Sequence, residues 1–179
     1  VNYVPKKDCY MILGVTGPNE YENNVNNNWY TNRIAAWNLN YAVDEAKLLK
    51  EQYPDDYSRL MKSLDLVEED FPEWKMIAGK MYLPEDKELG IFLQQDGYLD
   101  KEQILVKDLH KSNLPLNQKW SWDRILRSCY IKQADVLQGL FFFEEAYSED
   151  VTRRNFEFYE PRTVHESSLS PCVHSIMAS

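Results

Sequence analysis

Cysteine is scarce in this 179-residue chain, and long apolar runs are missing. The three cysteines, Cys9, Cys129 and Cys172, are odd in number and far apart. A disulfide framework needs an even, dense set, and a zinc site needs ligands at close CxxC-type spacing. Isolated thiols are typical of the reducing cytoplasm, where we expect the protein. The longest apolar run, 139–143, stops at Glu144 and is much shorter than the ~18 residues of a membrane-spanning helix.

Motifs of cofactor chemistry are also absent. The sequence contains no Gly-rich phosphate-binding loop, no GxGxxG, no HExxH and no GxSxG. It therefore predicts no cofactor and no catalytic metal. Acidic residues outnumber basic ones, 29 against 20, and the net charge of −9 repels phosphate backbones and anionic lipids. Neither a nucleic acid nor a membrane is therefore an expected partner.

What the chain does contain is a helical pattern. Apolar residues recur every three or four positions over 28–53, which predicts one face of a long helix, and these residues are Ala35, Leu39, Ala42, Ala46, Leu49 and Tyr53. Further helices are expected over 55–64, over 66–82 and in the last third, with a brief β-like run at 90–95. Helices joined by elaborate polar loops favour an all-α fold of helical hairpins, in which the loops build the functional face.

The segment 17–32 is the first of three that could carry chemistry. Seven of its sixteen residues are asparagine, and they accompany Tyr21, Trp29 and Tyr30. Amides exchange hydrogen bonds with hydroxyl groups, and aromatic faces cover the apolar side of a sugar ring. The segment therefore favours a polyhydroxyl ligand, with Glu20 at the rim of its pocket as an acid or base. The same residues also suit helix caps and turns, so this segment alone does not decide between a ligand site and a purely structural role.

The second segment, 119–136, gathers basic residues in an otherwise acidic protein. They suit an anionic substrate, or an exposed helix face with i,i+4 pairs such as Asp123–Arg127. The third segment, 159–171, places two hydroxyls before a helix, where they suit a bound phosphate or a cap at Ser168 or Ser170. His165 beside them suits an anion contact or a structural role.

Together and in this order, three strings resemble glycoside hydrolase family 65 along the whole chain. They are Gly14-Val15-Thr16-Gly17-Pro18-Asn19-Glu20-Tyr21, Ile131-Lys132-Gln133-Ala134-Asp135-Val136 and Thr163-Val164-His165-Glu166-Ser167-Ser168-Leu169-Ser170. The resemblance implies part of an (α/α)6 barrel, with the flanking β domains of the family absent from this chain. The chain lacks an initial methionine, and its last residues look like the opening of a helix. We therefore expect residues 1–179 to be the C-terminal portion of the catalytic barrel domain, a fragment of a longer protein.

The resemblance also implies the site residues. Glu20, the glutamate of the GP[DN]EY string, is the expected general acid. Lys132 and Gln133 are expected to hold the glucose that is transferred. The hydroxyls of Ser167 and Ser168, with His165 nearby, are expected to bind inorganic phosphate.

The reaction implied is inverting phosphorolysis of an α-linked glucose disaccharide, in which maltose and phosphate give β-D-glucose 1-phosphate and glucose. Phosphate is then a co-substrate and attacks the anomeric carbon while Glu20 protonates the leaving oxygen. Partial burial should raise the pKa of Glu20 so that it keeps its proton near neutral pH. The partners implied are a small sugar, phosphate, the rest of the barrel and a second copy in a homodimer.

Three alternatives stay open. The disaccharide could be trehalose, kojibiose or nigerose, because members of the family differ in the loops that shape the acceptor subsite. A hydrolase of the same fold would need a base, for which Glu160 and Glu166 are the candidates. A sugar-binding module would bind maltose without turnover.

Overall fold

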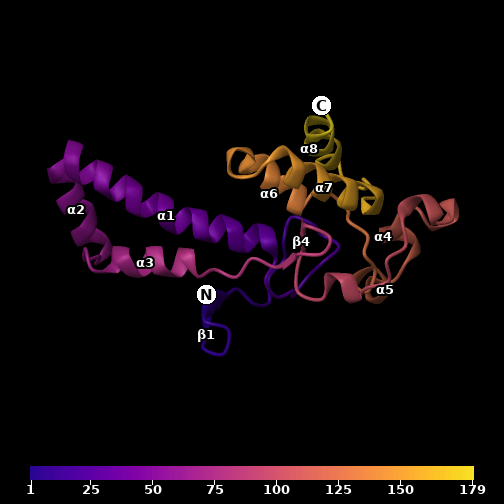
Figure 1. Cartoon of the computed structure of the whole chain (residues 1–179), viewed down its shortest axis with the longest axis horizontal. Coiled ribbons are helices and arrows are strands. Elements are labelled where there is room, and N and C mark those ends of the chain that lie inside the picture. The colour runs from indigo at the N-terminus through magenta and orange to yellow at the C-terminus, as the bar shows by residue number, and fades with distance from the viewer. The chain divides into compact units, whose positions relative to one another are not determined.

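The computed structural model describes residues 1–179, which divide into two compact units. The first unit comprises residues 1–11 and 32–82, and the second comprises residues 12–31 and 83–179. Eight α-helices and two short antiparallel hairpins form the regular structure (Figure 1). The all-α expectation is therefore confirmed. None of the helices combines the length and apolar character needed to cross a membrane.

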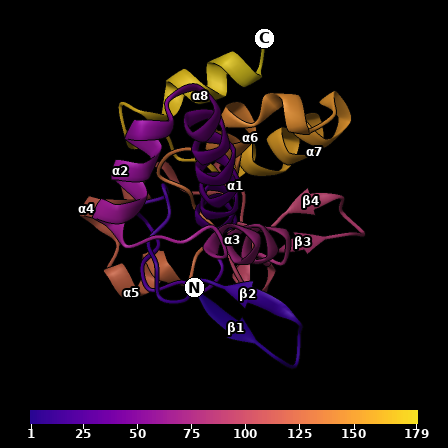
Figure 2. The same ribbon diagram turned by 90° about the vertical axis from the view of Figure 1, so that its left-hand side faces the viewer.

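Helix α1 (Trp29–Gln52) starts in the second unit and supplies most of its length to the first. Helix α2 (Pro54–Leu64) begins with a proline, whose fixed φ suits the first turn of a helix. Helix α3 (Asp70–Gly79) returns beside α1, where the Lys75 ammonium lies 3.2 Å from the Asp44 carboxylate. The first unit also contains a hairpin of β1 (Asn2–Val4) and β2 (Cys9–Met11), drawn as arrows in Figure 2.

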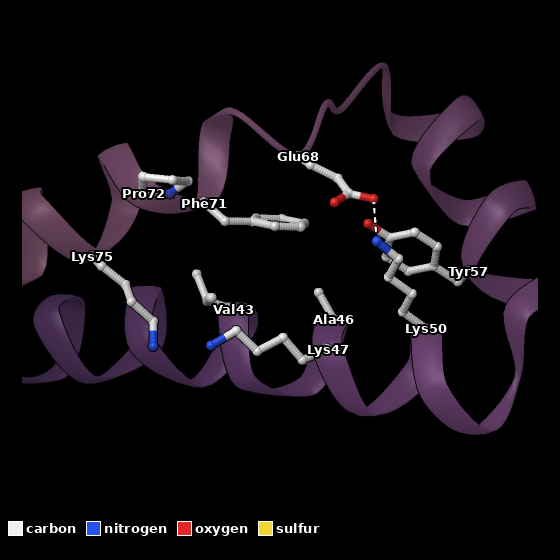
Figure 3. Close-up of a pocket in the computed structure, with 9 residues that line it drawn as sticks. All are labelled: Val43, Ala46, Lys47, Lys50, Tyr57, Glu68, Phe71, Pro72 and Lys75. Atoms are coloured by element: carbon white, nitrogen blue, oxygen red, sulfur yellow. Dashed lines mark hydrogen bonds and ion pairs between the residues drawn. The ribbon is translucent and has the colours of Figure 1, made fainter.

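An open pocket of about 410 Å³ lies between α1 and the first turns of α3, with Tyr57 of α2 and Glu68 also lining it. Figure 3 shows its apolar floor and the ion pair of Lys50 with Glu68, 2.5 Å apart, at one end. The lining residues are Val43, Ala46, Lys47, Lys50, Tyr57, Glu68, Phe71, Pro72 and Lys75. None of the site residues expected from the sequence lines this pocket.

The second unit holds a hairpin of β3 (Glu85–Asp86) and β4 (Ile91–Phe92), so the β-like run at 90–95 is a strand of only two residues. Five helices follow, α4 (Leu116–Lys119), α5 (Trp122–Leu126), α6 (Val136–Phe142), α7 (Glu149–Tyr159) and α8 (Ser170–Met177). The expected cap at the start of α8 is wrong, because Leu169 occupies that position and Ser170 is the first helical residue. The Ser170 hydroxyl instead contacts the ring of His165, with Oγ 2.8 Å from Nδ1.

The core of the second unit forms around aromatic residues and α6. Trp29 is fully buried and stacks on Phe92, with ring centroids 4.6 Å apart. Helix α6 packs against α7 and α8. The largest apolar cluster comprises Tyr21, Trp29, Tyr98, Leu116, Ile125, Cys129, Tyr130, Ile131, Ala134, Val136, Leu137, Leu140, Tyr159 and Val173. Tyr21 and Ile131 of this cluster directly adjoin the expected site residues Glu20 and Lys132 in the sequence.

Candidate active site

Residues 17–22, called here the acid turn, are held to the segment 131–135 by hydrogen bonds. The Gln133 side-chain amide donates to the carbonyl of Pro18 (2.7 Å), and the Lys132 N–H donates to Asn19 Oδ1 (2.9 Å). These partners lie 115 and 113 positions apart in the sequence. The fold therefore brings two of the three segments together, and these two hydrogen bonds hold them without using the Glu20 carboxyl.

Asp135 supports the same turn and was not singled out by the sequence. Its buried carboxylate accepts the Asn19 N–H (3.0 Å) and the Asn28 side-chain amide (2.9 Å). Burial raises the pKa of Asp135 to about 7, and the two hydrogen bonds oppose that shift. A Cβ on Gly17 would lie 2.6 Å from Asp135 Oδ2, so the turn needs glycine there. The sequence offered one signal for Asp135, namely a single carboxylate directly before the apolar residues that begin α6.

The side chain of Glu20 pairs with the Lys132 ammonium. This contact brings together the expected general acid and one of the expected sugar ligands. The expectation for the pKa of Glu20 is wrong, however. Its side chain is 55% exposed, and the hydrogen bond from Lys132 lowers its pKa by more than the small desolvation raises it.

Gln133 leaves one polar atom without a protein partner. Its amide nitrogen is used by Pro18, while its Oε1 is buried and accepts no hydrogen bond. Buried carbonyl oxygens are normally paired, and a hydroxyl group is a suitable donor. The arrangement fits the role expected for Gln133 toward a sugar.

Residues 163–168, called here the phosphate segment, are anchored to Ile131. The Ile131 N–H donates to the Arg162 carbonyl (3.0 Å), and the Ile131 carbonyl accepts the Val164 N–H (2.8 Å). Within the segment, Ser168 is exposed, and the Ser167 hydroxyl accepts the Leu169 N–H (3.3 Å). The segment is thus tied to Ile131 through Arg162 and Val164, and no hydrogen bond joins either serine to Glu20.

His165 has partners at both ring nitrogens. Nδ1 lies 2.8 Å from Ser170 Oγ, and Nε2 lies 3.3 Å from a Glu160 carboxylate oxygen. The other Glu160 oxygen contacts the buried ring of His174, whose pKa is lowered by burial and raised less strongly by Glu160. The ligand atoms of Glu160, His165 and His174 lie within 4.8 Å of one another, so these three residues could hold a divalent cation. In this structure they form a hydrogen-bonded cluster that fixes the His165 ring.

Glu166 links the phosphate segment to the acid turn. One carboxylate oxygen accepts the hydroxyl of Tyr21, and the other accepts the Leu116 N–H (2.6 Å). Tyr21 is almost fully buried, and burial, followed by the Glu166 contact, raises its pKa. Both carboxylates considered as a hydrolytic base, Glu160 and Glu166, are therefore engaged with protein groups.

The basic residues of 119–136 do not gather into one site. Arg127 pairs with Asp123 at 2.7 Å on an exposed surface, and the Arg124 guanidinium lies 3.6 Å from the centre of a Trp120 ring. The interpretation as an exposed helix face with an i,i+4 ion pair is therefore correct for Asp123 and Arg127. Of these cations, Lys132 is the one that reaches the acid turn.

The chain also matches known proteins along its whole length. Maltose phosphorylase of Bacillus subtilis (strain 168) is 51% identical over 179 residues, which are 100% of this chain and 23% of that protein. Alpha,alpha-trehalose phosphorylase of Thermoanaerobacter brockii is 42% identical over 178 residues, covering 99% of this chain and 23% of that protein. A solved structure from the human microbiome, described as a kojibiose phosphorylase, superposes with a TM-score of 0.87 at 36% identity, covering 99% of this chain and 23% of that one.

This chain spans less than a quarter of the length of these relatives. The sequence profile of the glycosyl hydrolase family 65 central catalytic domain matches residues 1–179. The helical fold and the relatives agree with that match. The chain therefore belongs to glycosyl hydrolase family 65 and forms a segment of its helical (α/α) barrel.

Proposed function

We propose that this chain is the C-terminal portion of the catalytic barrel of an inverting disaccharide phosphorylase that converts maltose and phosphate to β-D-glucose 1-phosphate and glucose. The observation that carries the proposal is the pairing of Glu20 with Lys132, from segments 112 positions apart. This contact supports the proposal because it joins the residue proposed as proton donor to a residue proposed to bind the sugar. The 51% identity to a protein named maltose phosphorylase favours maltose over the disaccharides named for the other relatives.

Glu20 supplies the proton. When a glucosyl unit binds Lys132 and Gln133, the Lys132 ammonium turns to sugar hydroxyls. The main cause of the low pKa of Glu20 is then removed, and exclusion of water by the sugar raises that pKa further. The carboxyl can then deliver its proton to the bridging oxygen as the bond from the anomeric carbon to that oxygen breaks.

Phosphate supplies the nucleophile. One of its oxygens attacks the anomeric carbon from the face opposite the leaving oxygen, which inverts the configuration. A hydrolase would need a free carboxylate to activate water. Glu160 is held by two histidines and Glu166 by Tyr21 and Leu116, so the hydrolytic alternative lacks a free base among its candidates. Phosphate needs no such base, because it is already a nucleophilic anion. The hydroxyls of Ser167 and Ser168, with His165, are proposed to bind it.

The decisive experiment is a product assay on the full-length enzyme with maltose, trehalose, kojibiose and nigerose, each with and without phosphate. We expect phosphate-dependent release of β-D-glucose 1-phosphate from maltose, with the anomer identified by NMR. Glucose release without phosphate would indicate the hydrolase. Binding without turnover would indicate a sugar-binding module. Preference for another disaccharide would contradict the assignment of maltose as substrate but not the assignment of phosphorolysis as the reaction.

Two variants assign the roles within the site. Glu20→Gln should lower kcat by about 10²–10⁴-fold, because it removes a positioned proton donor. Ser168→Ala should raise the KM for phosphate much more than the KM for maltose. Substantial turnover by the first variant would contradict the general acid, and unchanged constants in the second would move the phosphate site elsewhere.

The proposal also covers the rest of the protein, its oligomeric state, its location and its cofactors. We expect the rest of the barrel to complete the sugar pocket, the full protein to form a homodimer, and its location to be cytoplasmic. No organic cofactor or metal is expected to take part in the reaction.

A further inference from the structure

The acid turn and the phosphate segment must keep a fixed separation if an inverting reaction is to proceed in line. The donor lies on one side of the transferred sugar and the nucleophile on the other. A displacement of about 1 Å in such a site can cost about 10²-fold in rate. The side-chain groups that join these two parts of the chain therefore deserve a functional test.

Glu166 provides such a joint. It lies in the phosphate segment between His165 and Ser167, and its carboxylate accepts the hydroxyl of Tyr21, which directly follows Glu20. The second carboxylate oxygen is fixed by the Leu116 N–H at 2.6 Å. The carboxylate is thus clamped from two sides and cannot swing toward a substrate without breaking these bonds.

Tyr21 is a rigid partner in this joint. It is 1% exposed, and its ring meets the edge of Trp122 with centroids 6.1 Å apart. A movement of Glu166 is therefore passed to the backbone of the acid turn, because the Tyr21 ring has no space in which to rotate.

We propose that Glu166 is a positioning residue, which acts through Tyr21 to set the separation between the Glu20 carboxyl and the serines of the phosphate segment. The inference rests on the proposed function. It differs from the earlier role considered for Glu166, since the carboxylate neither activates water nor touches the substrate.

A double-mutant cycle tests the joint in the full-length enzyme. Tyr21→Phe removes one hydroxyl, and Glu166→Gln replaces an acceptor of the Leu116 N–H or of the Tyr21 hydroxyl by a donor. Each change should lower kcat about 10- to 100-fold and raise the KM for phosphate. The KM for maltose should stay within about twofold, because neither change removes a hydrogen bond of Lys132 or Gln133. The double variant should be no worse than the poorer single variant, because both changes remove the same interaction.

Tyr98→Phe is the matched control. It also removes a buried tyrosine hydroxyl, which donates to the Cys129 carbonyl at 2.7 Å and not to an expected site residue. It should reduce thermal stability and leave kcat and the KM for phosphate unchanged. Multiplicative losses in kcat for the double variant, or a control that lowers kcat as much as Tyr21→Phe, would overturn the positioning role. A wild-type enzyme without phosphorolysis would instead overturn the proposed function.

Discussion

At the residue scale, the central feature is the contact between Glu20 and Lys132. Glu20, as the proposed general acid, needs its proton near neutral pH, yet the ammonium of Lys132 lowers its pKa and favours the carboxylate. The two requirements are reconciled if the lysine exchanges the carboxylate for the sugar. In that case the free enzyme and the complex have different pKa values for the same acid.

This exchange predicts a pH effect of Lys132→Met. Removing the ammonium removes the largest cause that lowers the pKa of Glu20, so this pKa rises in the free enzyme. The alkaline limb of the profile of kcat/KM for maltose against pH should move to higher pH, while the maximum falls because the proposed contact of Lys132 with the sugar is lost. Arg127→Met removes a cation paired on the exposed surface and should leave the limb in place. A limb that moves to lower pH in Lys132→Met would contradict the exchange.

The sequence could nominate the candidate site residues, but it could not predict their environment. The strings around Glu20 and Lys132 are contiguous and specific. The exposure of Glu20 and the sign of its pKa shift depend on a partner 112 positions away, which no local pattern reports. Asp135 and the link from Glu166 to Tyr21 were missed for the same reason, because burial and hydrogen bonding over long separations are properties of the folded chain.

At the scale of elements, a helix or strand is predicted from the sequence more accurately the longer it is. The periodic pattern over 28–53 became α1 within one residue at each end, since a long amphipathic helix repeats its signal many times. The strand β4 is only two residues long and depends on pairing with β3. The start of α8 was misplaced by one position because the Ser170 hydroxyl contacts His165 instead of a backbone N–H.

Helix α6 offers a test in which packing opposes helix propensity. Gly139 lies within α6, and a Cβ there would be 2.5 Å from Cζ3 of the buried Trp29 ring. Gly139→Ala should therefore destabilise the fold by about 1–3 kcal/mol, although alanine is the better helix former by about 1 kcal/mol. Gly79→Ala, at the end of α3 with open space around it, should be neutral or stabilising. Urea unfolding measures both, and equal effects would contradict the packing argument.

At the scale of the whole molecule, one buried carboxyl ties stability to pH. Burial raises the pKa of Asp135 from 3.8 to about 7, so the folded chain holds this proton more tightly than the unfolded chain between these values. The stabilisation is fully present below about pH 4 and is lost as pH rises toward 7. Above that range both states have lost the proton, and the effect is constant.

Asp135→Asn should therefore reduce the fall in stability between pH 5 and pH 7.5, measured as the urea midpoint at each pH. The amide keeps an acceptor for the Asn19 N–H but cannot titrate. Asp55→Asn, an exposed position at the start of α2, serves as the control and should not change the slope. A slope unchanged in Asp135→Asn would assign the pH dependence to other groups.

The bonds that hold the acid turn have a practical consequence for capturing the uncleaved disaccharide. The turn is fixed through Pro18, Asn19 and Asp135, whereas the Glu20 side chain contributes only its exposed contact with Lys132. Replacing that carboxyl with its amide should thus stop the chemistry and leave the scaffold unchanged. Crystals of such a variant, soaked in maltose and phosphate together, should retain both reactants side by side before any bond is broken.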